Sequence, residues 1–223
     1  MKRNRVQLRM EVLEGRTLPA VVAFVHHGDL VVKPATEHDA GDDDITITQT
    51  GAGAYTVTAG AATVLNGVAG NAVALAGVTD DFRINTGRGN DTLLLTDLTV
   101  PDHLHVHTKA GDDVVTLTNV HVLGETSIET GAGNDAVNIN GGSVFDGHAK
   151  VETGHGNDAV AVDASTFNSR VKVELGKGND TLTSTNSIYN GKVEATGGDG
   201  FDTLVVDATN VFNARVKTRH FEA

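Results

Sequence analysis

Apolar and polar residues alternate over short stretches in the second half of the chain, and this alternation returns at a fixed interval. The first inward positions are Leu93, Val115, Val137, Val160, Leu182 and Leu204. Two residues later in each repeat come Leu95, Leu117, Ile139, Val162, Ser184 and Val206. A period of two places alternate side chains on one face of a β-strand. The pattern therefore predicts one short strand per repeat, with one face turned inwards.

Two further apolar stripes recur in the same repeats. One precedes the strand described above and consists of Ile84, Val106, Ile128, Val151 and Val173. The other follows it and consists of Leu123, Phe145, Phe167, Tyr189 and Phe212. Stacking the repeats in parallel, about 4.8 Å apart, buries each stripe against its own copies. We therefore expect three strands per repeat and an aromatic column that belongs to the core rather than to a sugar-binding platform.

The fold class that satisfies this pattern is all-β: a right-handed parallel β-helix (solenoid) with about 22 residues per coil. A helical solenoid would need an apolar period of 3.6, which the repeats lack. Residues 82–223 are expected to form the regular coils, and residues 25–81 degenerate coils or a cap. Asp43, in the sequence AGDDD at 40–44, precedes Asp91 by roughly twice the repeat length, which predicts a separation of two coils.

Each repeat also carries a turn motif, Gly-x-Gly-Asn-Asp or a close variant. Its final aspartates are Asp91, Asp113, Asp135, Asp158, Asp180 and Asp202, at intervals of 22, 22, 23, 22 and 22 in the sequence. Glycine allows the backbone to take positive φ, and Asn and Asp favour tight turns. Because the repeats stack, these aspartates are expected to form a column along one edge of the solenoid.

A column of carboxylates favours a hard cation as its neutraliser. At a spacing of about 4.8 Å, neighbouring charges repel by about 0.9 kcal/mol even at the dielectric constant of water. Ca²⁺ takes six to eight oxygen ligands and accepts backbone carbonyls, whereas Mg²⁺ requires a stricter octahedron. The candidate ligands are Asp91, Asp113, Asp135, Asp158 and Asp180, the carbonyls of Gly89, Gly133, Gly156 and Gly178, and Asp112 as an additional carboxylate. The alternative is that these turns form without metal and hold their carboxylates in water.

The motif at 131–135, 154–158 and 176–180 resembles the calcium-binding repeat of RTX (haemolysin-type) proteins. That resemblance implies Ca²⁺ bound between stacked turns of a parallel β-roll. This sequence departs from the family because its turn recurs once per coil, on one edge, instead of every nine residues on two edges. Thr130 and Thr153 also replace the leading glycine of the family motif.

Residues 1–24 are expected to be an export or targeting segment. The sequence LEGRTLPA at 13–20 resembles the LEDR-type N-terminal segment of planctomycete surface and secreted proteins, with Gly15 in place of the usual Asp. The resemblance implies a bacterial protein located outside the cell or at its surface. The alternative is an ordinary amphipathic tail. No apolar run approaches the roughly 18 residues of a membrane-spanning helix.

Composition narrows the possible functions. The 223 residues include 17 Lys and Arg against 29 Asp and Glu, which gives a formal net charge of −12 and argues against a nucleic-acid partner. The absence of cysteine excludes thiolate metal sites, cysteine nucleophiles and disulfides.

The outer faces of the predicted strands carry charged residues in register. Glu129, Glu152 and Glu174 align from coil to coil, Lys150 and Lys172 precede the last two by two residues, and together they are expected to form an ion-paired outer face. His103, His105 and His107 alternate along one strand and are expected to be exposed.

These features predict a non-enzymatic structural protein, exported and rigidified by calcium ions, whose partners are Ca²⁺ and an extracellular polysaccharide or another surface protein. A second possibility is a β-helix that binds or cleaves polysaccharide, an inference by analogy of fold alone. In that case Arg170 with Glu152 and Glu174 would be the place to look for catalysis. A third possibility is an adhesin-like module that uses the flat outer faces.

Overall fold

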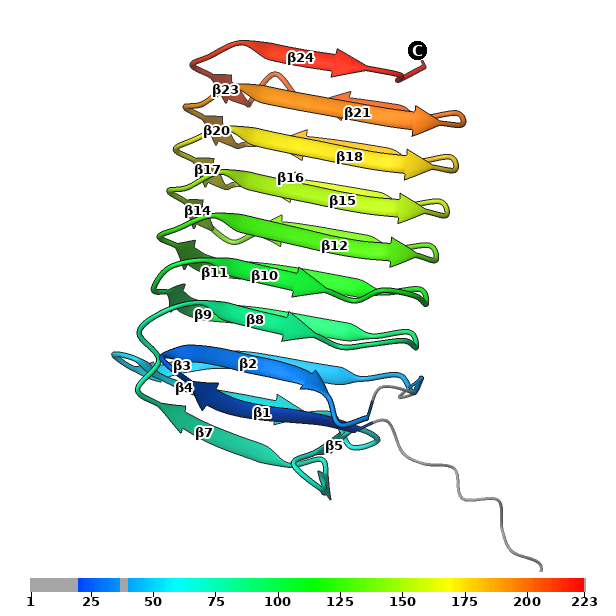
Figure 1. Cartoon of the computed structure of the whole chain (residues 1–223). Helices are drawn as coiled ribbons and strands as arrows, with labels where there is room; N and C mark the ends of the chain where they lie inside the picture. Colours follow the sequence, from blue (N-terminus) through cyan, green and yellow to red (C-terminus); the bar gives the residue numbers. More distant parts are fainter. Residues whose placement is uncertain (1–19, 37–39, 223) are drawn as a thin grey trace, which may run out of the picture.

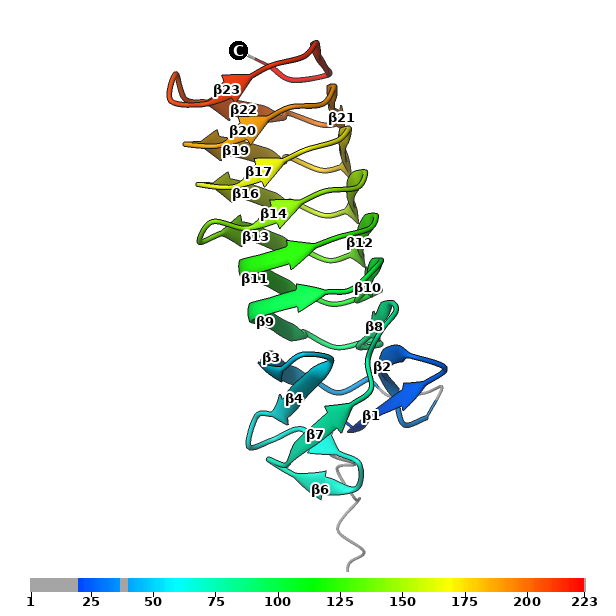
Figure 2. The ribbon, with the colours of Figure 1, turned by 90° about the vertical axis from the view of Figure 1, so that its left-hand side faces the viewer.

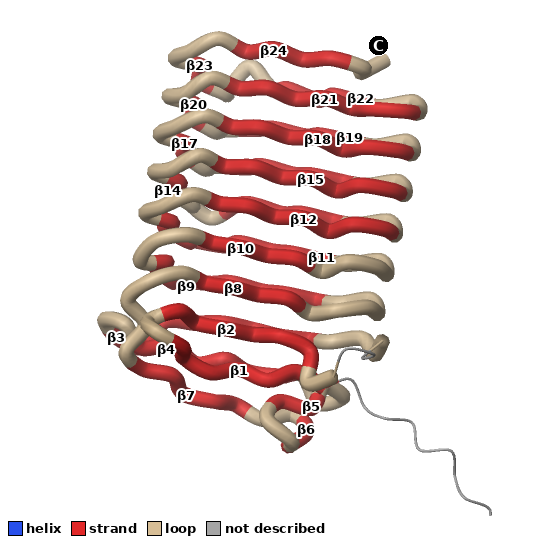
Figure 3. Tube along the Cα trace, viewed as in Figure 1, coloured by secondary structure: helices blue, strands red, loops and turns tan. Residues whose placement is uncertain are grey.

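The computed structural model describes residues 20–36 and 40–222, and within these residues every regular element is a β-strand. The coils stack along one axis with similar outlines (Figures 1 and 3). Among the described residues there is no helix that could cross a membrane. Most of the predicted export segment, residues 1–19, lies outside the described part of the chain.

The first face of the solenoid is an 11-stranded sheet. Its strands are β1 (Ala20–His26), β2 (Asp29–Pro34), β5 (Val64–Leu65), β6 (Val68–Ala69), β8 (Phe82–Asn85), β10 (Leu104–His107), β12 (Thr126–Ala132), β15 (Ala149–His155), β18 (Val171–Lys177), β21 (Val193–Asp199) and β24 (Val216–Arg219). From β2 and β8 to β24, neighbouring strands are parallel, and in the regular coils residues one repeat apart lie opposite each other, as Leu104 and Thr126 do. The predicted parallel β-solenoid and its coil length are confirmed.

The other two faces belong to one continuous sheet of 13 strands. The second face holds β3 (Asp44–Gly51), β4 (Ala54–Ala59), β7 (Ala72–Ala76), β13 (Ala136–Asn140), β16 (Ala159–Asp163), β19 (Thr181–Thr185) and β22 (Thr203–Val206). The third face holds β14 (Val144–Phe145), β17 (Thr166–Phe167), β20 (Ile188–Tyr189) and β23 (Val211–Phe212). β9 (Thr92–Val100) and β11 (Val114–Val122) run around the bend and contribute to both faces, as Figure 2 shows.

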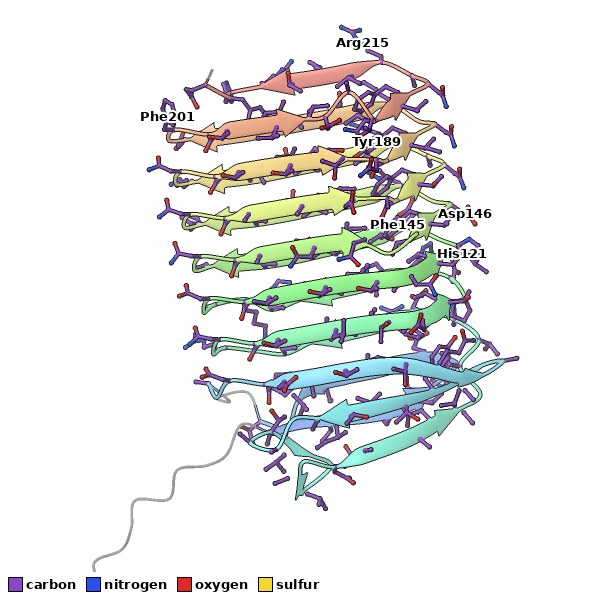
Figure 4. The ribbon with its side chains drawn as sticks, turned by 180° about the vertical axis from the view of Figure 1, so that it is seen from behind. His121, Phe145, Asp146, Tyr189, Phe201 and Arg215 are labelled. Carbon is purple, nitrogen blue, oxygen red and sulfur yellow. The ribbon has the colours of Figure 1, made fainter. Side chains whose placement is uncertain are left out.

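The apolar stripes fill the interior as the sequence predicts, except in the last coil, where Val206 is 47% exposed. Phe145, Phe167 and Tyr189 are buried and stack with Phe212 at ring-centroid distances of 4.9–5.1 Å. Figure 4 shows Phe145 and Tyr189 on coils of this column. One assignment was wrong: Leu123 is 46% exposed, and Val122 occupies the inward position opposite Phe145. The misassignment arises because the next coil contains one additional residue before its aromatic.

The additional residue lies at the bend between the second and third faces. Leu117 pairs with Ile139, an offset of 22, whereas Val122 pairs with Phe145, an offset of 23. Both Gly141 and Gly142 have positive φ there, whereas the coil before has a single left-handed residue, Asn119. A second left-handed glycine therefore absorbs the insertion without shifting the strands on either side.

The first coils differ from the prediction. β3 lies directly beside β9, with Asp44 opposite Thr92, so Asp43 is one coil away from Asp91 and the predicted intermediate coil is absent. The interval between Asp43 and Asp91 instead contains the antiparallel pairs β3–β4 and β4–β7 and the short pair β5–β6. These strands lie below the first regular coils in Figure 1. The ring of Tyr55 in β4 packs edge-on against the ring of Phe82 in β8, with 4.9 Å between the ring centroids.

The stacked bend between the second and third faces yields a test of local strain. Asp97, Asn119, Gly141, Ala164 and Asn186 occupy equivalent positions and all have positive φ. Ala164 is the one residue of this column whose side chain has no local means of stabilising that conformation.

Replacing Ala164 by Asn should raise the free energy of unfolding by about 1 kcal/mol, and the melting temperature by about 2–4 °C, because Asn adopts positive φ more readily. The matched control is Ala161→Asn in the extended strand β16, which should give no gain. Thermal unfolding followed by circular dichroism measures both. An equal effect of the two substitutions would show that the bend stores no strain at Ala164.

Candidate functional site

The motif aspartates form one column at the corner where the first face turns into the second, at the stacked turns on the right of Figure 1. All are buried, with at most 2% of each residue exposed: Asp43, Asp91, Asp113, Asp135, Asp158, Asp180 and Asp202. The predicted column along a single edge is therefore present. Its carboxylates point into the turn rather than into water, so the alternative with solvated carboxylates is excluded.

From Asp91 onwards, one oxygen of each carboxylate accepts a hydrogen bond from the coil before. The backbone N–H of Asp113 donates to Oδ1 of Asp135 at 2.9 Å, and that of Asp135 donates to Oδ1 of Asp158 at 2.8 Å. The same bond links each pair of successive aspartates from Asp43 to Asp202. At the end of the column, Oε2 of Glu222 accepts the N–H of Asp202 at 2.6 Å. We call this series of bonds the inner ladder.

A second series runs in the opposite direction along the outside of the same turns. The backbone N–H of Asp112 donates to Oδ1 of Asn90 at 2.7 Å, and that of Asn134 donates to Oδ1 of Asp112 at 2.7 Å. The pattern continues through Asn157 and Asn179 to the N–H of Phe201. We call this the outer ladder. Asp112 belongs to it and is exposed, so the structure does not bring its carboxylate into the buried column.

The motif glycines let the turns approach one another closely. A Cβ placed on Gly133 would lie 1.9 Å from the carbonyl oxygen of Gly111, and one on Gly156 would lie 1.8 Å from that of Gly133. Both residues also have φ above +130°. The predicted glycines Gly89, Gly133, Gly156 and Gly178 each donate their N–H to a carbonyl of the following coil. Their carbonyl oxygens face the α-carbon of the next glycine in the stack.

The second oxygen of the buried carboxylates lies deeper in the turn. The Oδ2 atoms of Asp113, Asp135, Asp158 and Asp180 are buried and make no hydrogen bond of normal geometry to any described residue. The hydroxyls of Thr108, Thr130 and Thr153 lie next to the first three of these carboxyls. Each hydroxyl donates to a backbone carbonyl of the following coil. A column of buried acceptor oxygens thus runs along the inside of the corner.

Burial alters the acidity of these carboxyls. Loss of hydration raises the pKa of Asp113, Asp135 and Asp180 to about 6, and also raises the pKa of Asp158. The N–H bonds of the inner ladder act in the opposite direction because they stabilise the ionised form. Neighbouring carboxyls in the column disfavour ionisation further at Asp113, Asp135 and Asp180. Near neutral pH, the column therefore carries negative charge, and none of the described Lys or Arg residues is buried beside it.

Two other groups of acidic residues lie close enough to share a metal ion, and the sequence analysis did not single them out. They are Asp81 with Asp102 and His103, and Asp29 with Asp80 and Asp81. Arg83 bonds Asp29 at 2.8 Å and Asp81 at 2.6 Å, and Asp81 also accepts the N–H of His103. Carboxylate oxygens of Asp29 and Asp81 are therefore already engaged by protein donors.

His103 is further restricted as a ligand. Its Nδ1 accepts the N–H of Glu125 at 2.8 Å, which places the proton of the neutral ring on Nε2. A protonated Nε2 cannot bind a metal. These residues carry no repeated signal because they belong to different, unequal turns at the start of the stack.

The outer surface of the first face is ion-paired, as the spacing of Lys and Glu predicts. Lys150 bonds Glu152 at 2.7 Å, and Lys172 bonds Glu174 at 2.5 Å. Arg170, considered with these glutamates for catalysis, instead pairs with Glu194. His107 lies 3.3 Å from Glu129 on the same exposed surface. Each candidate catalytic group is thus engaged in an ion pair on an open sheet.

No protein-family model, no curated protein and no solved structure matches the chain. The resemblance of the turn to RTX repeats therefore rests on the motif residues alone. What the structure itself shows is a parallel β-solenoid with a stacked, buried aspartate ladder.

The raised pKa values predict that the metal-free fold loses stability as pH rises. Between about pH 4 and pH 6 the folded state binds more protons than the unfolded state, so the free energy of unfolding falls through this window. In a chelating buffer, the melting temperature should be higher at pH 5 than at pH 7.5. Thermal unfolding across this range measures the effect.

Asp135→Asn and Asp158→Asn together provide the control. Their Oδ1 atoms still accept the N–H bonds, but the groups no longer titrate, so the pH dependence should become shallower. The free energy of unfolding at pH 7.5 should rise, because an amide at these positions does not bury a charge. A slope that is the same in the double variant would show that the column does not titrate in this range.

Proposed function

We propose that the chain is a non-enzymatic structural β-solenoid whose inner carboxylate column binds Ca²⁺ and is stiffened by it. The observation that supports this proposal is the column of buried Oδ2 atoms, each beside an Oδ1 already used by the backbone. Apart from the neighbouring Thr hydroxyls, a proton or a cation is the partner that such an oxygen can take. The Thr hydroxyls of the same turns add neutral oxygens, which Ca²⁺ accepts as ligands.

The choice of residue type at the two ladders strengthens the proposal. The outer ladder uses mostly Asn, at Asn90, Asn134, Asn157 and Asn179, and Asn satisfies a backbone N–H through its Oδ1 as well as Asp does. The inner ladder uses Asp in every coil from Asp43 to Asp202. An Asn there would place an NH₂ group inside the turn, whereas Asp keeps an acceptor. The inner position therefore favours a ligand that needs oxygen.

A structural role is supported by the regularity of the coils. From β8 to β21 successive strands are joined by short turns, and the outer face carries ion pairs on a flat sheet. We place this protein outside the cell or at its surface, on the resemblance of residues 13–20 to the LEDR-type segment. In that location, calcium would bind preferentially to the folded state and stabilise it by mass action.

The proposal predicts that Ca²⁺ raises the melting temperature at pH 7.5. Calcium at about 100 times its dissociation constant contributes about 2.7 kcal/mol, which corresponds to about 5–10 °C for a chain of this size. The shift should shrink at pH 5, because protons compete with the metal for the carboxylates. Melting curves with calcium and with chelator, at both pH values, measure it.

Variants locate the effect. Asp135→Asn with Asp158→Asn should remove most of the calcium-dependent shift, since both ligands belong to the column. Glu152→Gln with Glu174→Gln removes the same charge from the outer face and should leave the shift intact. Identical melting curves with calcium and chelator would refute calcium binding. A shift that survives the aspartate variant but not the glutamate variant would place the ion on the outer face.

A further inference from the structure

A cleft rich in cations opens near the start of the stack, where the first face meets the turns that end in Asp91 and Asp113. It has a volume of about 420 Å³ and is lined by Lys33, Pro34, Ala35, Thr36, Asn85, Gly87, Arg88 and Lys109. No carboxylate of the described residues lines it. Lys33, Arg88 and Lys109 are exposed, and none of them has an ion-pair partner among the described residues. Among the described residues, the lining of this cleft is thus positively charged, in a chain whose net charge is −12.

Several other cations of the same face are ion-paired. Arg83, Lys150, Lys172 and Lys192 each contact a carboxylate at 2.5–2.8 Å. A smaller hollow near the C-terminal coils does contain cations, but Glu174 and Glu194 line it too. Because screening limits charges to a range of about 8 Å at physiological salt, the three cations dominate the potential inside their own cleft.

Lys109 carries an independent sign of function. Its equivalents in the stack are all glycine: Gly87, Gly131, Gly154, Gly176 and Gly198. Lys109 nevertheless adopts φ of 77°, a conformation that costs an ordinary residue about 1 kcal/mol or more. The carbonyl of Lys109 accepts the N–H of Ala132 at 2.8 Å, which fixes the backbone in place. Strain of this kind is retained where the side chain does something that glycine cannot.

A second hollow continues the cleft. It has a volume of about 320 Å³ and shares Lys33 and Asn85 with the first, and its other lining residues include Arg83, His105, His107 and one carboxylate, Glu129. Together the two hollows form a trough across β2, β8 and β10, whose strands follow one another along the solenoid axis. Such a shape accommodates an extended ligand better than a compact one.

We infer that this trough binds a linear acidic polysaccharide, through carboxylate or sulfate groups held by Lys33, Arg88 and Lys109. Arg88 and Lys109 come from successive coils, so they match anionic groups repeated along a chain of sugars. The amide of Asn85 and the hydroxyl of Thr36 supply neutral partners for sugar hydroxyls. Nucleic acid fits less well because no Phe, Tyr or Trp side chain of the described residues lines the trough for base stacking.

The test measures binding of defined oligosaccharides to the whole chain by calorimetry at low salt, in chelator so that calcium cannot bridge acidic groups. The probes are sulfated heparin oligosaccharides, carboxylated oligogalacturonate, neutral dextran and a DNA duplex. Binding of the sulfated or the carboxylated probe, weakening as salt is raised, is expected. The stronger of the two identifies the anionic group. Neutral dextran should not bind.

A triple variant with Lys33→Gln, Arg88→Gln and Lys109→Gly should weaken that binding at least about tenfold. It should also keep or raise the melting temperature, since glycine relieves the strain at position 109. The matched control replaces Lys177, Arg215 and Arg219 by Gln, which removes the same charge from the later coils and should leave affinity within about twofold.

Failure of both acidic probes to bind, or unchanged affinity in the triple variant, would overturn the inference. Equal loss of affinity in the control triple would show that net charge alone acts. DNA binding as tight as that of the glycans would show that the trough recognises any polyanion. None of these outcomes bears on the calcium proposal, because the chelator removes the metal and the variants leave the aspartate column intact.

Discussion

Hydrogen bonds from backbone N–H groups to the side-chain oxygens of the neighbouring coil hold the corner of this solenoid together. Along the flat faces, each strand finds its partners in the parallel strands above and below. At the tight corner the backbone turns away from that pattern, and the N–H groups of the last two motif residues bond to side chains instead of carbonyls. The side chain of the outer-ladder Asn or Asp accepts an N–H from the following coil, and that of the inner-ladder Asp accepts an N–H from the coil before. An unmet backbone donor in such a buried position would cost about 1–3 kcal/mol per coil.

This constraint explains every position of the motif. The glycines allow coils to touch through their backbones, and the carbonyl of the residue between them accepts an N–H from the previous coil. Asn and Asp then bond in opposite directions along the axis. The motif is therefore sufficient to fix the register between coils before any ion is considered. A cation adds to this arrangement by neutralising charge that burial makes unfavourable at neutral pH.

Much of the fold was accessible from the sequence because the same contacts recur in every coil. The three stripes and their nearly constant interval predicted the stack, and the repeated aspartates predicted the column. The direction of the carboxylates was not accessible, since the motif is compatible with oxygens facing either water or the turn. The position of Asp43 was mistaken because a fixed period cannot reveal that the intervening strands fold back as antiparallel pairs.

The basic trough was equally hidden from the sequence. Lys33 and Lys109 are far apart along the chain, and neither belongs to a repeated pattern. In the sequence, the only sign of the trough is that Lys109 stands where the other repeats have glycine, which looks like a weakened motif. The substitution is informative only once Lys109 is known to have positive φ. Residues that maintain the repeat thus indicate the fold, whereas a residue that departs from it, such as Lys109, indicates a local feature of one coil.

The position of the added residue at Gly141–Gly142 shows how a protein of this design can change size. Its three bends differ in tolerance. The aspartate corner and the bend from the third face to the first keep a constant length, whereas the bend between the second and third faces accepts a longer path without disturbing the strands. Whole windings can be gained or lost as interchangeable units, each lengthening the rod by about 4.8 Å. Insertions within a coil, in contrast, are accommodated at the bend between the second and third faces. Loops of different lengths can therefore evolve along that one edge of the rod while its other edges stay uniform.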